Sequence, residues 1–112
     1  MDFGFEREAD AALFNNRAKL QRKLGVERAK KIRLRLDQIA GSPHLEALCK
    51  LPQARCHQLA GNRHEQFSLD LDGPYRLLVE VGDEPIPRLL DGGIDRNRVT
   101  RLWFIEITDT HQ

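Results

Sequence analysis

The sequence of 112 residues predicts an α+β fold, with helices packed on one face of a mostly antiparallel sheet of four to five strands. Two observations indicate this class. Apolar residues recur at helical spacing in the N-terminal part of the chain, and beyond about residue 55 they alternate with polar residues. The expected order is one strand, two helices and then four strands. Because no internal repeat, low-complexity tract or linker interrupts the pattern, residues 1–112 are expected to form a single domain.

The chain begins with the pattern of a short strand and a helix. Phe3 and Phe5 alternate with polar or small neighbours, as in a strand. A helix is then expected from Glu8 or Asp10, and Gly25 interrupts it. The apolar residues of this helix are Leu13, Phe14, Leu20 and Leu24.

A second helix is expected after Gly25. Its apolar stripe consists of Ala29, Ile32, Leu36 and Ile39, at steps of three and four. Gly41-Ser42-Pro43 ends it, as a glycine C-cap followed by proline does. The two segments predict a helical hairpin on the sheet, with one long kinked helix as the alternative.

The remainder of the chain is expected to be extended. The predicted strands are Arg55–Leu59, Gln66–Asp72, Tyr75–Val81 and Leu102–Ile107. Asp72-Gly73-Pro74 forms the turn of an antiparallel hairpin between the second and third of these strands. A polar loop at 82–99 precedes the last strand.

Composition and charge indicate an ordinary globular protein. Hydrophobic residues make up 40% of the chain and charged residues 31%, with a formal net charge of +1. No apolar run approaches the roughly 20 residues that span a bilayer. The N-terminus lacks the basic and apolar regions of a secretory signal. We therefore expect a cytoplasmic protein with no membrane partner.

The charge is distributed unevenly along the chain. Nine basic residues and only Glu27 as an acid lie between Arg17 and Arg35. This density predicts a helix face that attracts polyanions, and Lys30 and Lys31 are expected to contact RNA. The alternative is a solvated helix face without a ligand.

Cys49 and Cys56 are the two cysteines, and in a cytosolic chain we expect free thiols. Zinc is the alternative, since His44, His57 and His64 lie nearby. However, the spacing lacks the paired ligands that pre-organise a tetrahedral zinc site. Neither a metal nor another cofactor is expected.

Polar residues of the predicted sheet suit phosphodiester chemistry on RNA. They are Arg55, His57, Arg63, His64, Gln66, Ser68, Arg76 and His111. Histidine moves protons near neutral pH, and arginine offers a permanent charge whose geometry matches phosphate. Each of these residues also has a structural alternative. The strand histidine can be a partly buried residue whose hydrogen bonds are satisfied within the protein, and the terminal histidine can be disordered. Arg76 can be a structural partner of Asp70 or Asp72 across the hairpin.

Several sequence motifs, which follow one another in a fixed order, together cover nearly the whole chain. Residues 51–63 read LPQARCHQLAGNR and resemble the LPG.RCH.LKGDR segment of HigB-like killer proteins, within the RelE/ParE toxin superfamily. Residues 66–71 and 73–78 resemble the GQ.S and YRL.F strands of that family. The ending at 106–111 is similar to its terminal DYH, and the helix at 29–32 fits a related subgroup.

The resemblance implies the RelE/ParE fold. It also implies that the chain is the toxin of a type II toxin–antitoxin system and that this toxin cleaves mRNA in the ribosomal A site. The implied partners are a helix-turn-helix, HigA-like antitoxin, the mRNA on the ribosome, and promoter DNA contacted only through the antitoxin complex. His57, Arg76 and His111 fall on the catalytic positions of the family. Arg63 is our hypothesis for an additional cation, with Arg55 and His64 as alternatives. The expected RNA-contacting residues are Arg55, His64, Gln66, Ser68, Lys30 and Lys31.

The chain departs from the family pattern at two positions. The catalytic lysine of the family falls on Ala60, and the tyrosine before the terminal histidine falls on Thr110. Alanine carries no proton or charge, and threonine cannot stack on a base. A non-catalytic binding module that acts as a co-repressor with an antitoxin therefore stays open. A gyrase-directed poison is a third alternative, with little support from the histidines.

Overall fold

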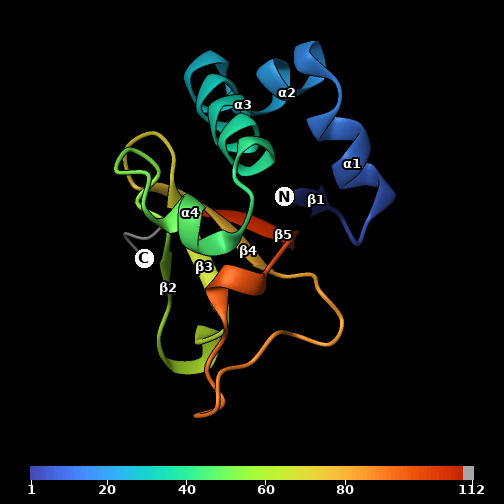
Figure 1. Ribbon diagram of the computed structural model, residues 1–112. Coiled ribbons are helices and arrows are strands. Elements are labelled where there is room, and N and C mark those ends of the chain that lie inside the picture. The colour runs from blue at the N-terminus through green and yellow to red at the C-terminus, as the bar shows by residue number, and fades with distance from the viewer. Residues whose placement is uncertain (110–112) are drawn as a thin grey trace.

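The computed structural model describes residues 1–109, which form four α-helices, two 3₁₀ helices and one five-stranded sheet (Figure 1). The strands are β1 (Asp2–Gly4), β2 (His57–Gln58), β3 (Gln66–Asp70), β4 (Tyr75–Val81) and β5 (Arg101–Asp109). The α-helices are α1 (Glu8–Phe14), α2 (Arg17–Leu24), α3 (Val26–Gly41) and α4 (Leu45–Cys49). The 3₁₀ helices are η1 (Gly61–Arg63) and η2 (Arg96–Arg98). The predicted α+β class is confirmed.

The sheet has the strand order β1-β5-β4-β3-β2. The pairing of β1 with β5 is parallel, and the other three pairings are antiparallel. This mixed, mostly antiparallel arrangement is the expected one. The predicted strand at Tyr75–Val81 has those bounds, whereas β2 is shorter than the predicted Arg55–Leu59.

The helical region differs from the predicted two-helix hairpin, because three helices occupy residues 8–41. The side chain of Asn16 accepts a hydrogen bond from the backbone N–H of Lys19 at 3.0 Å and thereby caps a new helix, α2. Gly25 separates α2 from α3 and has a φ of +88°, which favours glycine. The expectation of one continuous helix before Gly25 was therefore wrong.

The short helix α4 was not predicted as a helix. His44 precedes it, and its ring accepts a hydrogen bond from the backbone N–H of Ala47 at 3.2 Å. This histidine, which the sequence offered as a zinc ligand, thus has a capping role.

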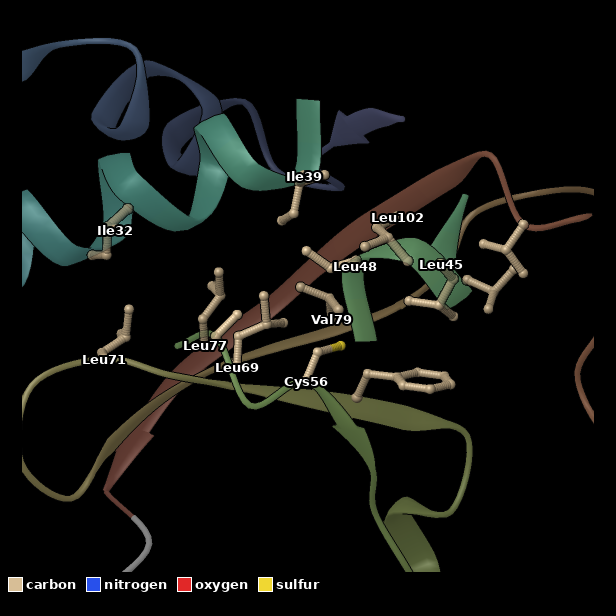
Figure 2. Close-up of a cluster of buried hydrophobic side chains, with 14 of the residues drawn as sticks. Ile32, Ile39, Leu45, Leu48, Cys56, Leu69, Leu71, Leu77, Val79 and Leu102 are labelled. Atoms are coloured by element: carbon tan, nitrogen blue, oxygen red, sulfur yellow. The ribbon is translucent and has the colours of Figure 1, made fainter. Parts of the chain in front are cut away.

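The core lies between the helices and one face of the sheet, which we call the covered face. Figure 2 shows Ile32 and Ile39 of α3 directed towards Leu69, Leu77 and Val79 of the central strands. These five side chains are fully buried. The helical apolar stripe and the alternating strand pattern therefore bury the same core.

Two arginines of the basic segment also face the sheet. The side chain of Arg35 is buried, at 2% exposure, and donates to the carbonyl oxygens of Asp70 at 2.7 Å and Gln53 at 2.9 Å. Arg28 forms an ion pair with Asp72 at 3.0 Å, and its guanidinium lies 3.4 Å from the ring centre of Tyr75. The basic helix face predicted for residues 17–35 therefore does not include these two arginines. They attach α3 to the hairpin of β3 and β4.

A long loop joins β4 to β5, as predicted for residues 82–99. Asp83 holds its two ends together by accepting hydrogen bonds from the backbone N–H groups of Thr100 and Arg101, at 3.1 and 3.0 Å. Further along the loop, Arg88 forms an ion pair with Glu65. Within residues 1–109, no helix is long and apolar enough to cross a membrane.

Candidate functional site

The sheet face opposite the helices, which we call the open face, carries most of the polar residues selected from the sequence. Ser68 pairs with Leu78, and Leu78 pairs with Glu106, so these three side chains lie in one row across β3, β4 and β5. The open face includes Gln66, Ser68, Asp70, Arg76, Leu78, Glu80, Trp103, Glu106 and Thr108. Alternation along the strands separates these residues from those of the covered face.

A hollow of about 260 Å³ lies on the open face. Its lining residues are Leu59, Arg63, Ser68, Leu78, Thr108 and Asp109. Ser68 and Leu78 are each only 2% exposed although they lie away from the helices. Ser68 is therefore nearly buried, and its small exposed surface lines this hollow.

His57 extends the open face to the edge strand β2. It pairs with Ser68, while the preceding Cys56 points into the core (Figure 2), so the imidazole lies on the opposite side from the core. The ring Nδ1 lies 2.8 Å from the carbonyl oxygen of Arg55. Because a carbonyl only accepts, Nδ1 carries the proton in this contact, and Nε2 is the basic nitrogen of the neutral ring.

Arg76 and Arg55 both contact the same carboxylate. Arg76 forms an ion pair with Asp70 at 3.0 Å and also donates to the carbonyl oxygens of Gly73 and Tyr75. Arg55 lies 3.6 Å from the other oxygen of Asp70, and its side chain is 75% exposed. The structure therefore contains the ion pair between Arg76 and Asp70 that we gave as the structural alternative for Arg76. Arg55 is the more accessible cation.

Arg63 lies in η1, at the rim of the hollow. It donates to the side-chain oxygen of Gln66 at 2.8 Å and lies 3.7 Å from the carboxylate of Glu106. His64 follows it and is exposed, and its carbonyl oxygen accepts a hydrogen bond from Gln58. The turn after β2 therefore places Arg63 near the row of Ser68 and Glu106.

Lys30 and Lys31 do not belong to this site. They lie on α3, whose buried residues pack on the covered face. Lys30 is exposed and Lys31 is half-buried, beside Glu27 and Asp37 around a separate surface hollow. An RNA strand on the open face would have to pass around the sheet to reach them.

The site is less positive than its residue types suggested. Arg55 and Arg76 form ion pairs with the carboxylate of Asp70, and Arg63 forms an ion pair with Glu106. Neither acid was selected from the sequence as a site residue. The alternation of Glu106 and Thr108 with apolar neighbours in β5 is the signal that could have placed both on this face.

His111 and Thr110 lie outside the described residues. Ala60, where the resemblance led us to expect a lysine, is exposed beside η1. Among residues 1–109, no three His, Cys, Asp or Glu side chains are grouped so as to hold a metal ion. Cys49 and Cys56 are free thiols.

Comparison with known proteins gives no family: no protein-family model matches the chain, and no curated protein matches it in sequence.

Proposed function

We propose that this chain is the toxin of a type II toxin–antitoxin pair, with a RelE/ParE-like, HigB-like fold and an mRNA endoribonuclease activity on its open face. The proposal rests on the order of motifs in the sequence and on one feature of the structure. His57 is held on the open face opposite Ser68, with its Nδ1 on the backbone carbonyl of Arg55, and Arg55 and His57 line one surface hollow. An oriented imidazole suits general base catalysis on a phosphodiester.

The chemistry requires a base, an acid and positive charge. In the proposed reaction, Nε2 of His57 removes the proton from a ribose 2′-hydroxyl, whose oxygen attacks the adjacent phosphorus. In this proposal Arg55 and Arg63 stabilise the added negative charge, while Arg76 holds Asp70 between itself and Arg55. The departing 5′-oxygen takes a proton from an acid, and we propose His111 for this role.

The proposed partners follow from the same resemblance. A helix-turn-helix, HigA-like antitoxin would neutralise the toxin, and the pair would bind promoter DNA through the antitoxin. The substrate would be mRNA on the ribosome, and the protein would act in the cytoplasm.

A non-catalytic co-repressor with this fold is the second candidate. The carboxylates of Asp70 and Glu106 support it, because they offset much of the arginine charge on the open face. Ala60 supports it as well, since no lysine is available at that position. A co-repressor needs the antitoxin but no acid or base.

Expression of the chain without an antitoxin separates the two candidates. A catalytic toxin stops growth, and the joint substitution His57→Ala with His111→Ala should restore it. Arg22→Ala is the matched control, since Arg22 is an exposed cation on α2, away from the open face. No growth arrest by the wild type, or full arrest by the double variant at equal protein level, would contradict the proposed mechanism.

The additional cation is tested in the same assay. Arg63→Ala and His64→Ala remove neighbouring groups of η1 and the residue after it. If Arg63 stabilises phosphate charge, its loss should weaken growth arrest more than the loss of His64. Unchanged arrest in both variants would remove these residues from the site.

A further inference from the structure

The two cysteines of the chain lie together although they belong to different elements. Cys49 ends α4, and Cys56 precedes β2. Their Sγ atoms are 3.6 Å apart, within hydrogen-bonding distance for sulfur. A disulfide bond has an S–S length of about 2.05 Å, so an approach of roughly 1.5 Å would join them.

The surroundings make the two thiols chemically different. The hydrogen bond with Cys56 lowers the pKa of Cys49, and the positive charge of Arg96 lowers it further. The contact with Cys49, together with burial, raises the pKa of Cys56. The Nη1 of Arg96 lies 3.8 Å from the sulfur of Cys49. Cys49 is therefore the thiol favoured as thiolate, which is the nucleophilic form.

Solvent access also favours Cys49 over Cys56 as the thiol that reacts first. Cys49 is half-buried, whereas Cys56 is only 6% exposed. Both line an open surface hollow of about 460 Å³, together with Leu51, Pro52, Arg55 and His57. A small oxidant can enter this hollow and meet the more exposed sulfur first.

We propose that Cys49 and Cys56 form a reversible intramolecular disulfide when a peroxide oxidises Cys49. The Cys49 thiolate attacks one peroxide oxygen, the O–O bond breaks, and the departing oxygen takes up a proton. This gives a sulfenic acid at Cys49. The sulfur of Cys56 then attacks the sulfur of Cys49, so the S–S bond forms, the S–O bond breaks and water leaves with the proton of Cys56. The two thiols supply the two electrons that reduce the peroxide, and a small dithiol restores the reduced pair.

The disulfide would link the end of α4 to the residue before His57. It would also remove the Cys49 thiol that lies beside Arg96, whose Nη2 lies 3.4 Å from the side-chain oxygen of Gln58 in β2. Any effect on RNA cleavage rests on the proposed function. The formation of the disulfide does not, and it can be measured without an activity assay.

The test counts free thiols in the whole chain before and after hydrogen peroxide. Samples are denatured, alkylated with N-ethylmaleimide and weighed by intact-mass spectrometry. The chain contains two cysteines, so the reduced protein should carry two adducts. After oxidation the monomer should carry none, and dithiothreitol should restore both. Two retained adducts, or oxidation that yields only intermolecular dimers, would overturn the proposal.

Single variants test the order of events. Cys56→Ser should leave a sulfenic acid on Cys49 that dimedone labels, whereas Cys49→Ser should react at least about tenfold more slowly. Arg96→Gln should slow disulfide formation, because it removes the positive charge that favours the Cys49 thiolate. Equal rates in Cys49→Ser and Cys56→Ser would contradict the assignment of Cys49 as the first thiol oxidised.

A comparison that uses only the wild-type protein does not depend on whether the variants fold. The same oxidation is run on native protein and on protein unfolded in guanidinium chloride. Native proximity should make disulfide formation clearly faster in the folded chain. An equal or faster rate in the unfolded chain would show that the fold does not prepare the pair.

Discussion

The two faces of one sheet serve different purposes in this molecule. On the covered face, Leu77 and Val79 pack under α3 with no exposed surface. On the open face the same strands carry Ser68 and the ion pair of Arg76 with Asp70. Because successive residues of a strand point to opposite sides, one segment stabilises the fold and presents polar groups at once. Core packing and the proposed chemistry therefore share the same strands but depend on different residues of them.

Truncation of a core leucine should give the largest effect. Leu77→Ala opens a cavity beneath a long helix, and we expect a loss of about 2–5 kcal/mol in the free energy of unfolding. Leu78→Ala on the open face should cost less, about 1–3 kcal/mol, because the short segment at 59–63 can collapse onto the gap. Chemical denaturation of both variants measures the difference. A larger loss for Leu78→Ala would reverse our ranking of the two faces.

The buried Arg35 should come next. Arg35→Leu leaves the carbonyl oxygens of Asp70 and Gln53 without this donor, and we expect a loss of about 2–4 kcal/mol. Lys30→Leu on the same helix is the control, since Lys30 is exposed and its replacement should stay within about 0.5 kcal/mol. Similar stability of the two variants, followed by urea unfolding, would show that Arg35 does not fasten α3 to the sheet.

The two arginines around Asp70 should differ by a smaller amount. Arg76 is 23% exposed and 3.0 Å from Asp70, whereas Arg55 is 75% exposed and 3.6 Å away. We expect Arg76→Ala to cost about 1–2 kcal/mol and Arg55→Ala less than about 0.5 kcal/mol. Double-mutant cycles with Asp70→Asn isolate each pairing. An equal coupling energy in the two cycles would contradict a structural role specific to Arg76.

The ion pair of Glu65 with Arg88, beyond the edge of the open face, should have the smallest effect. The hydrogen bond from Arg88 lowers the pKa of Glu65 below its usual value of 4.5. The folded state therefore binds this proton less readily than the unfolded state, so the pair stabilises the fold above about pH 4.5 and loses that contribution as the pH falls through the lowered pKa.

Thermal unfolding across pH checks this sign. Wild type should be slightly more stable than Glu65→Gln at pH 7, and the gap should close in acid. In an Arg88→Gln background, Glu65→Gln should have no such pH-dependent effect. A gap that widens as the pH falls would mean that the carboxylate is not stabilised by Arg88.

The sequence predicted the regular parts of the fold because their periodicity is local. The strand Tyr75–Val81 and the stripe of α3 follow directly from alternation and helical spacing. The break at Asn16 was missed, because an asparagine within a helical pattern becomes a cap only when the chain turns there. The helix α4 was missed since it is only five residues long.

The residue types of the candidate site could be predicted from the sequence, but the ion pairs between them could not. Period two placed Gln66 and Ser68 on one face, whereas the register that sets Asp70 between Arg55 and Arg76 depends on the fold. The meeting of Cys49 with Cys56 is also tertiary. It depends on the turn at 50–55, where Arg55 has a φ of +46°, a conformation that few residues adopt.

Mapping of mRNA 5′ ends after brief expression tests the proposed RNA cleavage most directly. Primer extension should reveal new ends within coding regions for the wild type and for Arg22→Ala. His57→Ala, at equal protein level and with native stability, should reduce these ends by about 10²-fold or more, because it removes the proposed base. The same ends at the same intensity in His57→Ala, or no new ends in the wild type, would contradict RNA cleavage by this open face.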